Sequence, residues 1–308
     1  MKILFDSHTH INNDGYSEEE RAQLIAAIED SEVAYVMDVG FDLPSSERAV
    51  SDAALLPWCY AAVGVHPHDT KTMTEEIYEK IRRLAGQPKV QAIGEIGLDF
   101  YYNHSDAEDQ RYWFRRQIRL ANELHMPIVI HAREADQETM DILKEEGAFS
   151  EERCGWFPPR PGTGIGRKAG AQTTQKASRA GEGGRAEACD CTENCCMEKD
   201  ARVLLHCFSG SRELAEQYVK LGATISIAGP VTYKNNRKTS EVVSAIPIEY
   251  LLVETDAPYL TPEPHRGKKN QSPYVAYTAR RVALLKGISY EEAARRTLEN
   301  AKRFYGID

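Results

Sequence analysis

Phe5-Asp6-Ser7-His8-Thr9-His10 is the stretch of this sequence that decides the fold. Ile3, Leu4 and Phe5 are apolar and predict a short buried strand that ends in two histidines one residue apart. Side chains alternate between the two faces of an extended chain, so His8 and His10 point to the same side. Two imidazoles on one face can hold one metal ion. An ordinary surface or capping pair is the alternative, and the rest of the chain decides between them.

Apolar runs alternate with amphipathic stretches along the whole chain. Eight short apolar runs predict strands at residues 3–7, 33–39, 59–64, 90–96, 127–130, 203–205, 223–228 and 250–254. Helical periodicity predicts helices at residues 17–30, 74–85, 108–125, 134–146, 211–221, 240–245, 274–285 and 289–305. Strand–helix alternation repeated eight times predicts an α/β fold, a single-domain (β/α)8 TIM barrel over residues 1–308. A doubly wound open sheet is the alternative architecture.

Residues 148–201 break this alternation. They are rich in Gly, Pro, Arg, Ser and Thr and have almost no periodic apolar residues. Such a composition cannot bury enough apolar surface to offset the entropy of ordering, so we expect an inserted, largely disordered loop on the active-site rim. Its cysteines could hold zinc or form a redox switch, although their spacing does not match ordinary zinc modules. They are Cys154, Cys189, Cys191, Cys195 and Cys196.

Composition limits the possible partners. A formal net charge of −9 argues against non-specific coating of nucleic acid, which requires a broad basic surface, but leaves room for a local basic groove. The chain passes from Met1-Lys2 directly into a strand and has no long apolar run. We therefore expect a cytoplasmic protein with no membrane association, no obligate protein partner and reduced cysteines.

Polar residues that can bind metal or move protons fall at the carboxyl ends of the predicted strands. They are His8, His10, His66, Glu95, His131, His206 and Asp256. Active sites of barrels are built at that face, where residues far apart in sequence meet. Each residue alone has an ordinary explanation, such as a helix N-cap for an acid after a strand. Together they predict two metal sites.

The order of the strands suggests how the ligands divide. His8, His10 and Asp256 come from the first and last strands, which are neighbours when a barrel closes, so they suit one ion. His131 and His206 come from the fifth and sixth strands and suit a second ion.

Glu95 lies between the two sets, and its two carboxylate oxygens can bridge both ions. Nitrogen and carboxylate ligands are compatible with zinc or manganese, and a partly hydrated pair with magnesium, so ligand type does not identify the metal. A water shared by two divalent ions becomes a hydroxide nucleophile. Asp256 is the best placed general base for that water.

A second set of residues is expected to contact substrate around the metal centre. We assign His66 to the scissile group, with a loop-pinning role as the alternative. Positive charge near the predicted site suggests phosphate contacts, although a solvated run of charge is the usual explanation for such a cluster. The expected substrate contacts are His66, His104, Arg133, Arg266 and Lys268.

The blocks that carry these residues resemble the TatD-type metal-dependent deoxyribonucleases of the amidohydrolase superfamily. They are FDSHTH (5–10), GVHPHD (64–69), AIGEIGLDFYY (92–102), PIVIHAR (127–133), LLHCFSGS (204–211), VETDAPYL (253–260) and PEPHRGKKNQSPYV (262–275). The resemblance covers residues 1–147 and 202–308 and implies a TIM-barrel hydrolase with divalent metal ions that trims the 3′ ends of single-stranded DNA. It implies a substrate-contacting His66 and the metal ligands His8, His10, Glu95, His131, His206 and Asp256.

Two other functions remain compatible with the sequence. The same hydroxide could attack an ester or amide, as in a hydrolase that releases a wrong-handed amino acid from transfer RNA (a D-aminoacyl-tRNA deacylase). A third hypothesis makes the cysteine-bearing insertion a metal or redox sensor and the barrel its scaffold.

Overall fold

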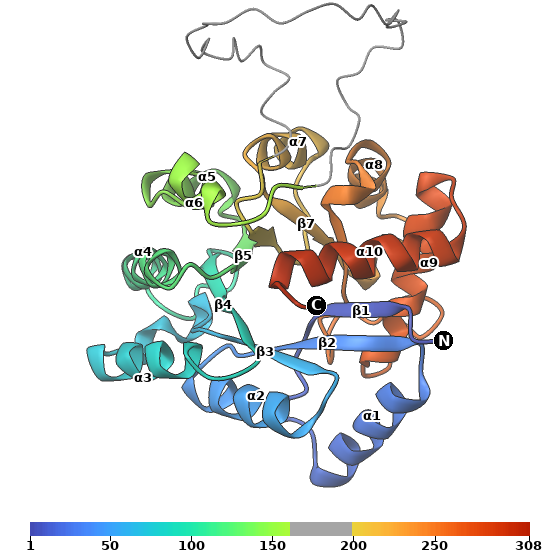
Figure 1. Ribbon diagram of the computed structural model, residues 1–308, viewed down its shortest axis with the longest axis horizontal. Helices are drawn as coiled ribbons and strands as arrows, with labels where there is room; N and C mark the ends of the chain where they lie inside the picture. The colour runs from blue at the N-terminus through green and yellow to red at the C-terminus, as the bar shows by residue number, and fades with distance from the viewer. Residues whose placement is uncertain (161–198) are drawn as a thin grey trace, which may run out of the picture.

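The computed structural model describes residues 1–160 and 199–308. Within them, each strand pairs in parallel with the next one in sequence, and helices cover the outside of the sheet (Figure 1). This arrangement confirms the predicted TIM barrel. The strands are β1 (Leu4–Thr9), β2 (Val33–Val39), β3 (Cys59–Val63), β4 (Val90–Asp99), β5 (Ile128–Arg133), β6 (Val203–Leu205), β7 (Thr224–Ile227) and β8 (Leu251–Val253).

The α-helices lie between successive strands and after the last one. They are α1 (Glu18–Asp30), α2 (Leu43–Leu55), α3 (Glu75–Ala85), α4 (Ala107–Glu123), α5 (Asp136–Glu145), α6 (Glu151–Gly155), α7 (Arg212–Lys220), α8 (Arg237–Ala245), α9 (Val275–Lys286) and α10 (Tyr290–Tyr305). Short 3-10 helices of the described residues join them: η1 (Pro67–Thr72), η3 (Gly229–Thr232), η4 (Ile248–Tyr250) and η5 (Ser272–Tyr274). In the part of the chain described, no helix is both long and apolar enough to cross a membrane.

The first and last strands close the barrel at its carboxyl end. Thr9 bridges to Ala257 in parallel. On either side of that bridge, the Asp256 amide donates to the His8 carbonyl and the His10 amide donates to the Ala257 carbonyl, both at 2.9 Å. The closure therefore brings the first strand and the loop after the last strand together at residues expected to form the active site.

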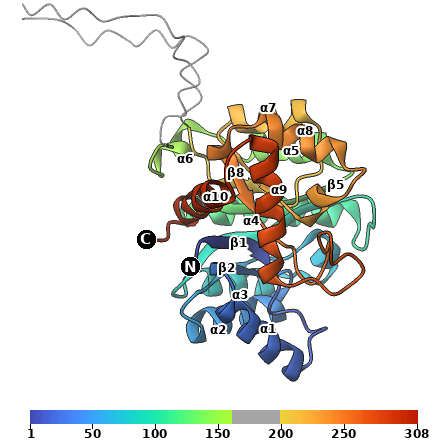
Figure 2. The same ribbon diagram turned by 90° about the vertical axis from the view of Figure 1, so that its right-hand side faces the viewer.

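Helix α10 covers the opposite, amino-terminal mouth of the barrel. Its residues Ala301, Phe304 and Tyr305 pack against a buried cluster of inward-facing side chains, one or two from most strands. The Tyr305 hydroxyl donates to the Ser7 carbonyl at 2.9 Å. In Figure 2, α10, α6 and both chain ends lie on the same side of the barrel. One end of the barrel is thus sealed by apolar packing, and the other is left for polar side chains.

The sequence analysis did not predict helix α2. It begins with a capping box in which the Asp42 side chain accepts from the Ser45 amide, and it has Pro44 in its first turn. Its buried face consists of small and polar side chains, namely Ser45, Ser46, Ala49, Asp52 and Ala53. The pattern lacks the stripe of large apolar residues by which helices are recognised, because small side chains suffice where a helix lies close to its neighbours.

Residues at both ends of the expected insertion are ordered. Helix α6 lies inside the interval expected to be a loop, and the side chains of Arg153 and Arg160 are fully buried. Arg160 Nη2 pairs with Asp200 Oδ1 at 3.1 Å, which joins the two ends of the segment. The cysteines Cys189, Cys191, Cys195 and Cys196 fall outside the described residues, and Cys154 is a half-buried free thiol.

The two described ends of this segment do not lie at the active-site rim, where the sequence analysis expected them, and residues 161–198 lie outside the described part of the chain. The segment follows α5 and α6 and precedes β6, so it is a helix-to-strand connection. Such connections lie at the amino-terminal face of a barrel, whereas active sites use the strand-to-helix loops. Arg160 also donates to the carbonyls of Gly222 and Ala223, just before β7 begins, which places it at that amino-terminal face.

We expect Asp200→Asn to lower the free energy of unfolding by about 3–5 kcal/mol, because it leaves the buried Arg160 guanidinium without its charged partner. The Asp200 carboxylate also accepts from Arg303 Nε at 3.3 Å, which adds to the loss. Urea unfolding followed by circular dichroism measures the change. Glu151→Ala, which removes an exposed pair with Lys199, is the control and should change little. A loss below about 1 kcal/mol for Asp200→Asn would contradict a buried clamp.

Candidate active site

Imidazole and carboxylate side chains from most of the barrel meet at its carboxyl end. His8 lies in β1, Glu95 in β4 and His131 in β5, whereas His206 directly follows β6 and Asp256 follows β8. Strand β4 extends to Asp99 rather than ending near residue 96, so Glu95 lies inside the strand and not at its end. The structure therefore brings all six expected ligands, including His10, into one cluster.

A close approach of β4 to β5 brings two of these residues together. Gly97 has φ +149°, and a Cβ at this position would lie 1.9 Å from the His131 carbonyl oxygen. A side chain here would force the strands apart. The glycine thus allows Glu95 and His131 to reach hydrogen-bond distance, with His131 Nδ1 2.9 Å from Glu95 Oε1.

The two carboxylate oxygens of Glu95 face different histidines. Oε1 lies 2.9 Å from His131 Nδ1 and 2.8 Å from His206 Nε2. Oε2 lies 3.4 Å from His8 Nε2 and 3.9 Å from His10 Nε2. Asp256 Oδ1 lies on the second side, 3.4 Å from His10 Nε2. Glu95 is therefore the one carboxylate of the expected set that contacts both halves of the cluster.

Hydrogen bonds at the far nitrogen orient three of the rings. His10 Nδ1 lies 2.7 Å from the Val39 carbonyl oxygen, which can only accept. His131 Nε2 faces Asp99 Oδ2 at 3.2 Å, and His206 Nδ1 faces Glu254 Oε1 at 3.3 Å. In a neutral ring each of these nitrogens carries the proton, so the other nitrogen presents its lone pair to the cluster. The ring nitrogens that face the cluster are His10 Nε2, His131 Nδ1 and His206 Nε2.

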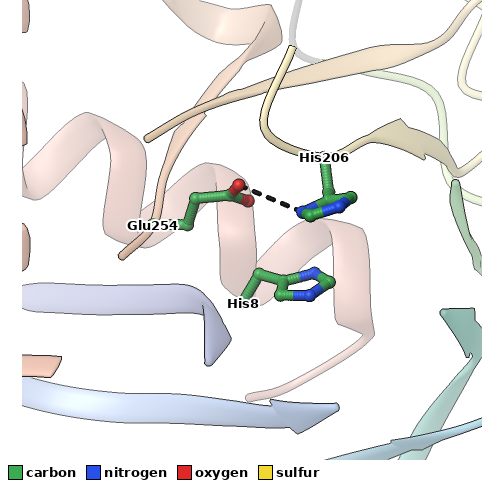
Figure 3. Close-up of side chains that lie close together, drawn as sticks. All are labelled: His8, His206 and Glu254. Carbon is green, nitrogen blue, oxygen red and sulfur yellow. Dashed lines mark hydrogen bonds and ion pairs between the residues drawn. The ribbon is translucent and has the colours of Figure 1, made fainter. Parts of the chain in front are cut away.

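His8 has no such partner. Its ring is fully buried and stacks on the His206 ring with centroids 3.9 Å apart, as Figure 3 shows beside Glu254. Neither ring nitrogen of His8 makes a hydrogen bond with any described residue, and Glu254 Oε2 is likewise buried without one. A buried imidazole costs free energy unless its nitrogens are satisfied, so these atoms indicate a missing ligand.

The donor set fits divalent cations. Lone pairs of ring nitrogens and carboxylate oxygens face one another, an arrangement that only a shared positive charge makes favourable. Three groups have potential ligand atoms all within 4.8 Å of one another. They are His8, His10 and Asp256; His66, Glu95 and His131; and His8, His206 and Glu254.

The electrostatics of the cluster follow from the same geometry. Burial acts to raise the pKa of Glu95, but the imidazoles around it, His206 foremost, hold it well below its usual value. Burial acts likewise on Asp256, and the neighbouring His10 imidazole brings its pKa below the usual value. Both acids are therefore ionised at neutral pH and available to a cation.

His66 differs from the other histidines. Its Nδ1 accepts from the His68 amide at 3.1 Å, so Nδ1 holds the lone pair and Nε2 carries the proton of the neutral ring. Burial lowers the pKa of His66 well below its usual value, with Glu95 opposing and His131 adding to the effect. The neutral ring thus points an N–H donor into the site, which suits a substrate oxygen better than a metal ion.

The remaining expected substrate contacts lie around the site without touching the cluster. Arg133 lies over the rings of Tyr101 and Tyr102 at 4.3 and 4.5 Å. His104 stacks on Tyr102 with centroids 5.5 Å apart. Arg266 lies over the Tyr233 ring at 4.4 Å, and Lys268 is exposed on the same loop.

Sequence reasoning missed Asp99 and Glu254, which position His131 and His206 from behind. Asp99 Oδ2 also lies 2.8 Å from His68 Nε2. A signal existed for both. Asp99 is four residues from Glu95 and Glu254 two residues from Asp256, even spacings that place side chains on one face of an extended chain.

Known proteins are similar to this chain in sequence and in fold. A family model described as TatD related DNase matches residues 5–155 and 183–306. The chain is 37% identical over 306 residues to the uncharacterized metal-dependent hydrolase YabD of Bacillus subtilis, covering 99% of this chain and 100% of that protein. It is 29% identical over 310 residues to the 3′-5′ ssDNA/RNA exonuclease TatD of Erwinia tasmaniensis, covering 99% and 100%.

A solved structure supports the fold. YJJV, a TatD homologue from Escherichia coli K12, matches with a TM-score of 0.77 at 22% sequence identity, covering 100% of this chain and 99% of that chain.

We expect Glu254→Gln to weaken binding of Mn²⁺ roughly 10–100-fold, because the amide keeps the bond from the Cys207 amide but no longer gives His206 a charged acceptor. Calorimetric titration of metal-stripped protein measures the affinity. Glu241→Ala, an exposed acid on α8, is the control. Equal affinity in Glu254→Gln and wild type would show that Glu254 does not support a metal ligand.

Proposed function

This chain belongs to the TatD related DNase family of metal-dependent hydrolases, and we propose that it is a 3′–5′ exonuclease that hydrolyses phosphodiester bonds of single-stranded DNA with two divalent metal ions. The observation that carries the proposal is Glu95, whose two oxygens face two separate sets of imidazoles. A relative named as a 3′-5′ ssDNA/RNA exonuclease supports the substrate class.

The residues that would hold the ions follow from the cluster. His8, His10 and Asp256 would hold one ion and His131 and His206 the other, and Glu95 would be shared. Magnesium, manganese and zinc all remain compatible with this donor set. When bound, the ions supply the Lewis acidity that activates water near neutral pH and offsets the charge of the phosphate.

Asp256 is the general base in this proposal. It is ionised at neutral pH, since its pKa lies below the usual value. Its side chain is 14% exposed, compared with 5% for Glu95, so it is the acid of the pair that an incoming substrate can reach. Asp256 would accept the proton of the attacking water and pass it to the leaving 3′ oxygen.

His66 would hold the scissile phosphate. Its protonated Nε2 lies 3.5 Å from Glu95 Oε1, so a phosphate oxygen beside Glu95 falls within reach of the same donor. A fixed donor aimed at developing negative charge stabilises the transition state more than the ground state.

Exposed aromatic rings at the rim favour single strands. Tyr101 and Tyr102 are 54% and 48% exposed, and the Arg133 guanidinium covers both. Unpaired bases can stack on such rings, whereas bases in a duplex are already stacked, and Arg133 can meet the phosphates between them. Arg266 and Lys268 would extend these backbone contacts along the loop after β8.

We expect Glu95→Ala to lower trimming of 3′-labelled single-stranded DNA at least about 100-fold, because both ions lose a ligand. Metal-stripped protein is assayed with Mg²⁺, Mn²⁺ or Zn²⁺ supplied, and Glu299→Ala on α10 is the control. Equal trimming by Glu95→Ala and wild type would reject the proposed site. Absence of cleavage by wild type shown to hold two ions would instead favour an ester or amide substrate, such as a D-aminoacyl-tRNA.

We expect His66→Ala to lower kcat about 10²–10³-fold while leaving Mn²⁺ affinity within about twofold, since the lost donor acts on substrate alone. His131→Ala is the matched comparison and should lose both activity and metal affinity. Steady-state kinetics and calorimetry on the same preparations separate the two roles. A joint loss of metal affinity in His66→Ala would make His66 a metal ligand.

A further inference from the structure

Buried arginines gather around a single acid at the amino-terminal face of the barrel, opposite the active site. In the described ranges, Asp200 is the only carboxylate within ion-pair distance of any of them. The group consists of the buried Arg153, Arg160 and Arg202 and the partly exposed Arg303. On a chain with net charge −9, this is a local excess of positive charge held away from water.

Three of the four guanidinium groups donate to named acceptors. Arg160 and Arg303 both pair with Asp200. Arg153 donates through Nε to the Ala201 carbonyl at 2.9 Å and through Nη2 to the Met126 carbonyl at 2.7 Å. Arg153 thus joins the starts of β5 and β6.

Arg202 differs from them, because none of its side-chain nitrogens donates to an acceptor within residues 1–160 and 199–308. It is only 8% exposed, and its Nε, like that of Arg160, is buried with no hydrogen-bond partner. Its guanidinium lies over the Phe157 ring at 4.6 Å, and among residues 1–160 and 199–308 no side chain or carbonyl accepts a hydrogen bond from it. A buried charge without an acceptor is costly, so the position indicates an anion that binds here.

A pocket of about 370 Å³ lies against Arg202, between the starts of β4 and β5 and the end of α10. His125 and Gln91 add polar groups to its lining, whereas Leu124 and Met126 form an apolar wall. The His125 ring stacks on Trp156 with centroids 4.1 Å apart. The pocket therefore lies against the Arg202 guanidinium and has room for a ligand larger than a simple ion.

We propose that this pocket is a second ligand site, which binds a phosphate group from inorganic phosphate or a small phosphomonoester through Arg202. A phosphate offers several acceptor oxygens to the arginine fork and carries up to two charges, enough to offset much of the excess around Asp200. The site lies across the barrel from the residues of the proposed nuclease centre and does not depend on that function.

The test uses full-length, metal-stripped protein and isothermal titration calorimetry with three probes: inorganic phosphate, deoxyadenosine 5′-monophosphate and deoxyadenosine. Wild type should bind the two phosphate-bearing probes saturably and deoxyadenosine not at all. Arg202→Met should weaken that binding at least about tenfold, because the charged fork is lost. Arg295→Gln, an exposed arginine of α10, should bind as wild type does. Tighter binding of the nucleotide than of phosphate would assign the ligand to the phosphomonoesters, and equal binding would assign it to phosphate.

A thermal melt separates this role from a structural one. In phosphate-free buffer Arg202→Met should melt no lower than wild type, because an unpaired buried charge is removed. Added phosphate should raise the melting temperature of wild type and not that of Arg202→Met. A lower melting temperature for the variant without phosphate, or phosphate binding that Arg202→Met leaves unchanged, would overturn the proposal.

Discussion

The Glu95 carboxylate is surrounded by ring nitrogens of five histidines, at distances between 2.8 and 3.9 Å. In their neutral form, three of the rings turn lone pairs toward the cluster, because their other nitrogens face acceptors on Val39, Asp99 and Glu254. Acceptors that face acceptors repel one another unless positive charge lies between them. The site is thus organised for cations. Three features hold that arrangement in place: the barrel, its closure between Thr9 and Ala257, and the buried acids behind the rings.

One end of the barrel stabilises the fold, and the other end carries the residues of the candidate active site. At the carboxyl end, buried polar groups are left open toward a shared centre, which costs stability unless ligands bind. At the amino-terminal end, α10 seals the interior and Arg160 with Asp200 clamps the base of β6 and β7. The described residues on both sides of the inserted segment, Arg160 and Asp200, meet at the clamped face.

Much of the catalytic cluster was predictable because parallel strands all end at one face. Once eight strands are recognised, His8, His131 and His206 must lie near one another whatever the helices do. The residues that orient the rings were harder to predict. Asp99 and Glu254 resemble ordinary acids near strand ends, and only the distances to His131 and His206 show which nitrogen each one fixes.

Other features were not predicted from the sequence, for different physical reasons. Helix α2 packs through small residues and so has no apolar stripe. Arg153 and Arg160 lie in a stretch whose composition is that of a solvated loop, but their acceptors are backbone carbonyls and Asp200, which pattern analysis cannot see. The ends of the insertion were assigned to the wrong face, although the predicted helix at 134–146 and strand at 203–205 already made it a helix-to-strand connection.

The most direct test of this account is the electron paramagnetic resonance spectrum of metal-stripped protein titrated with Mn²⁺. If Glu95 is shared between two ions, the protein should bind two Mn²⁺ per chain, and the saturated sample should show the spectrum of an exchange-coupled pair. One ion per chain, or two ions with the spectrum of isolated Mn²⁺, would contradict the shared carboxylate on which the proposed mechanism depends.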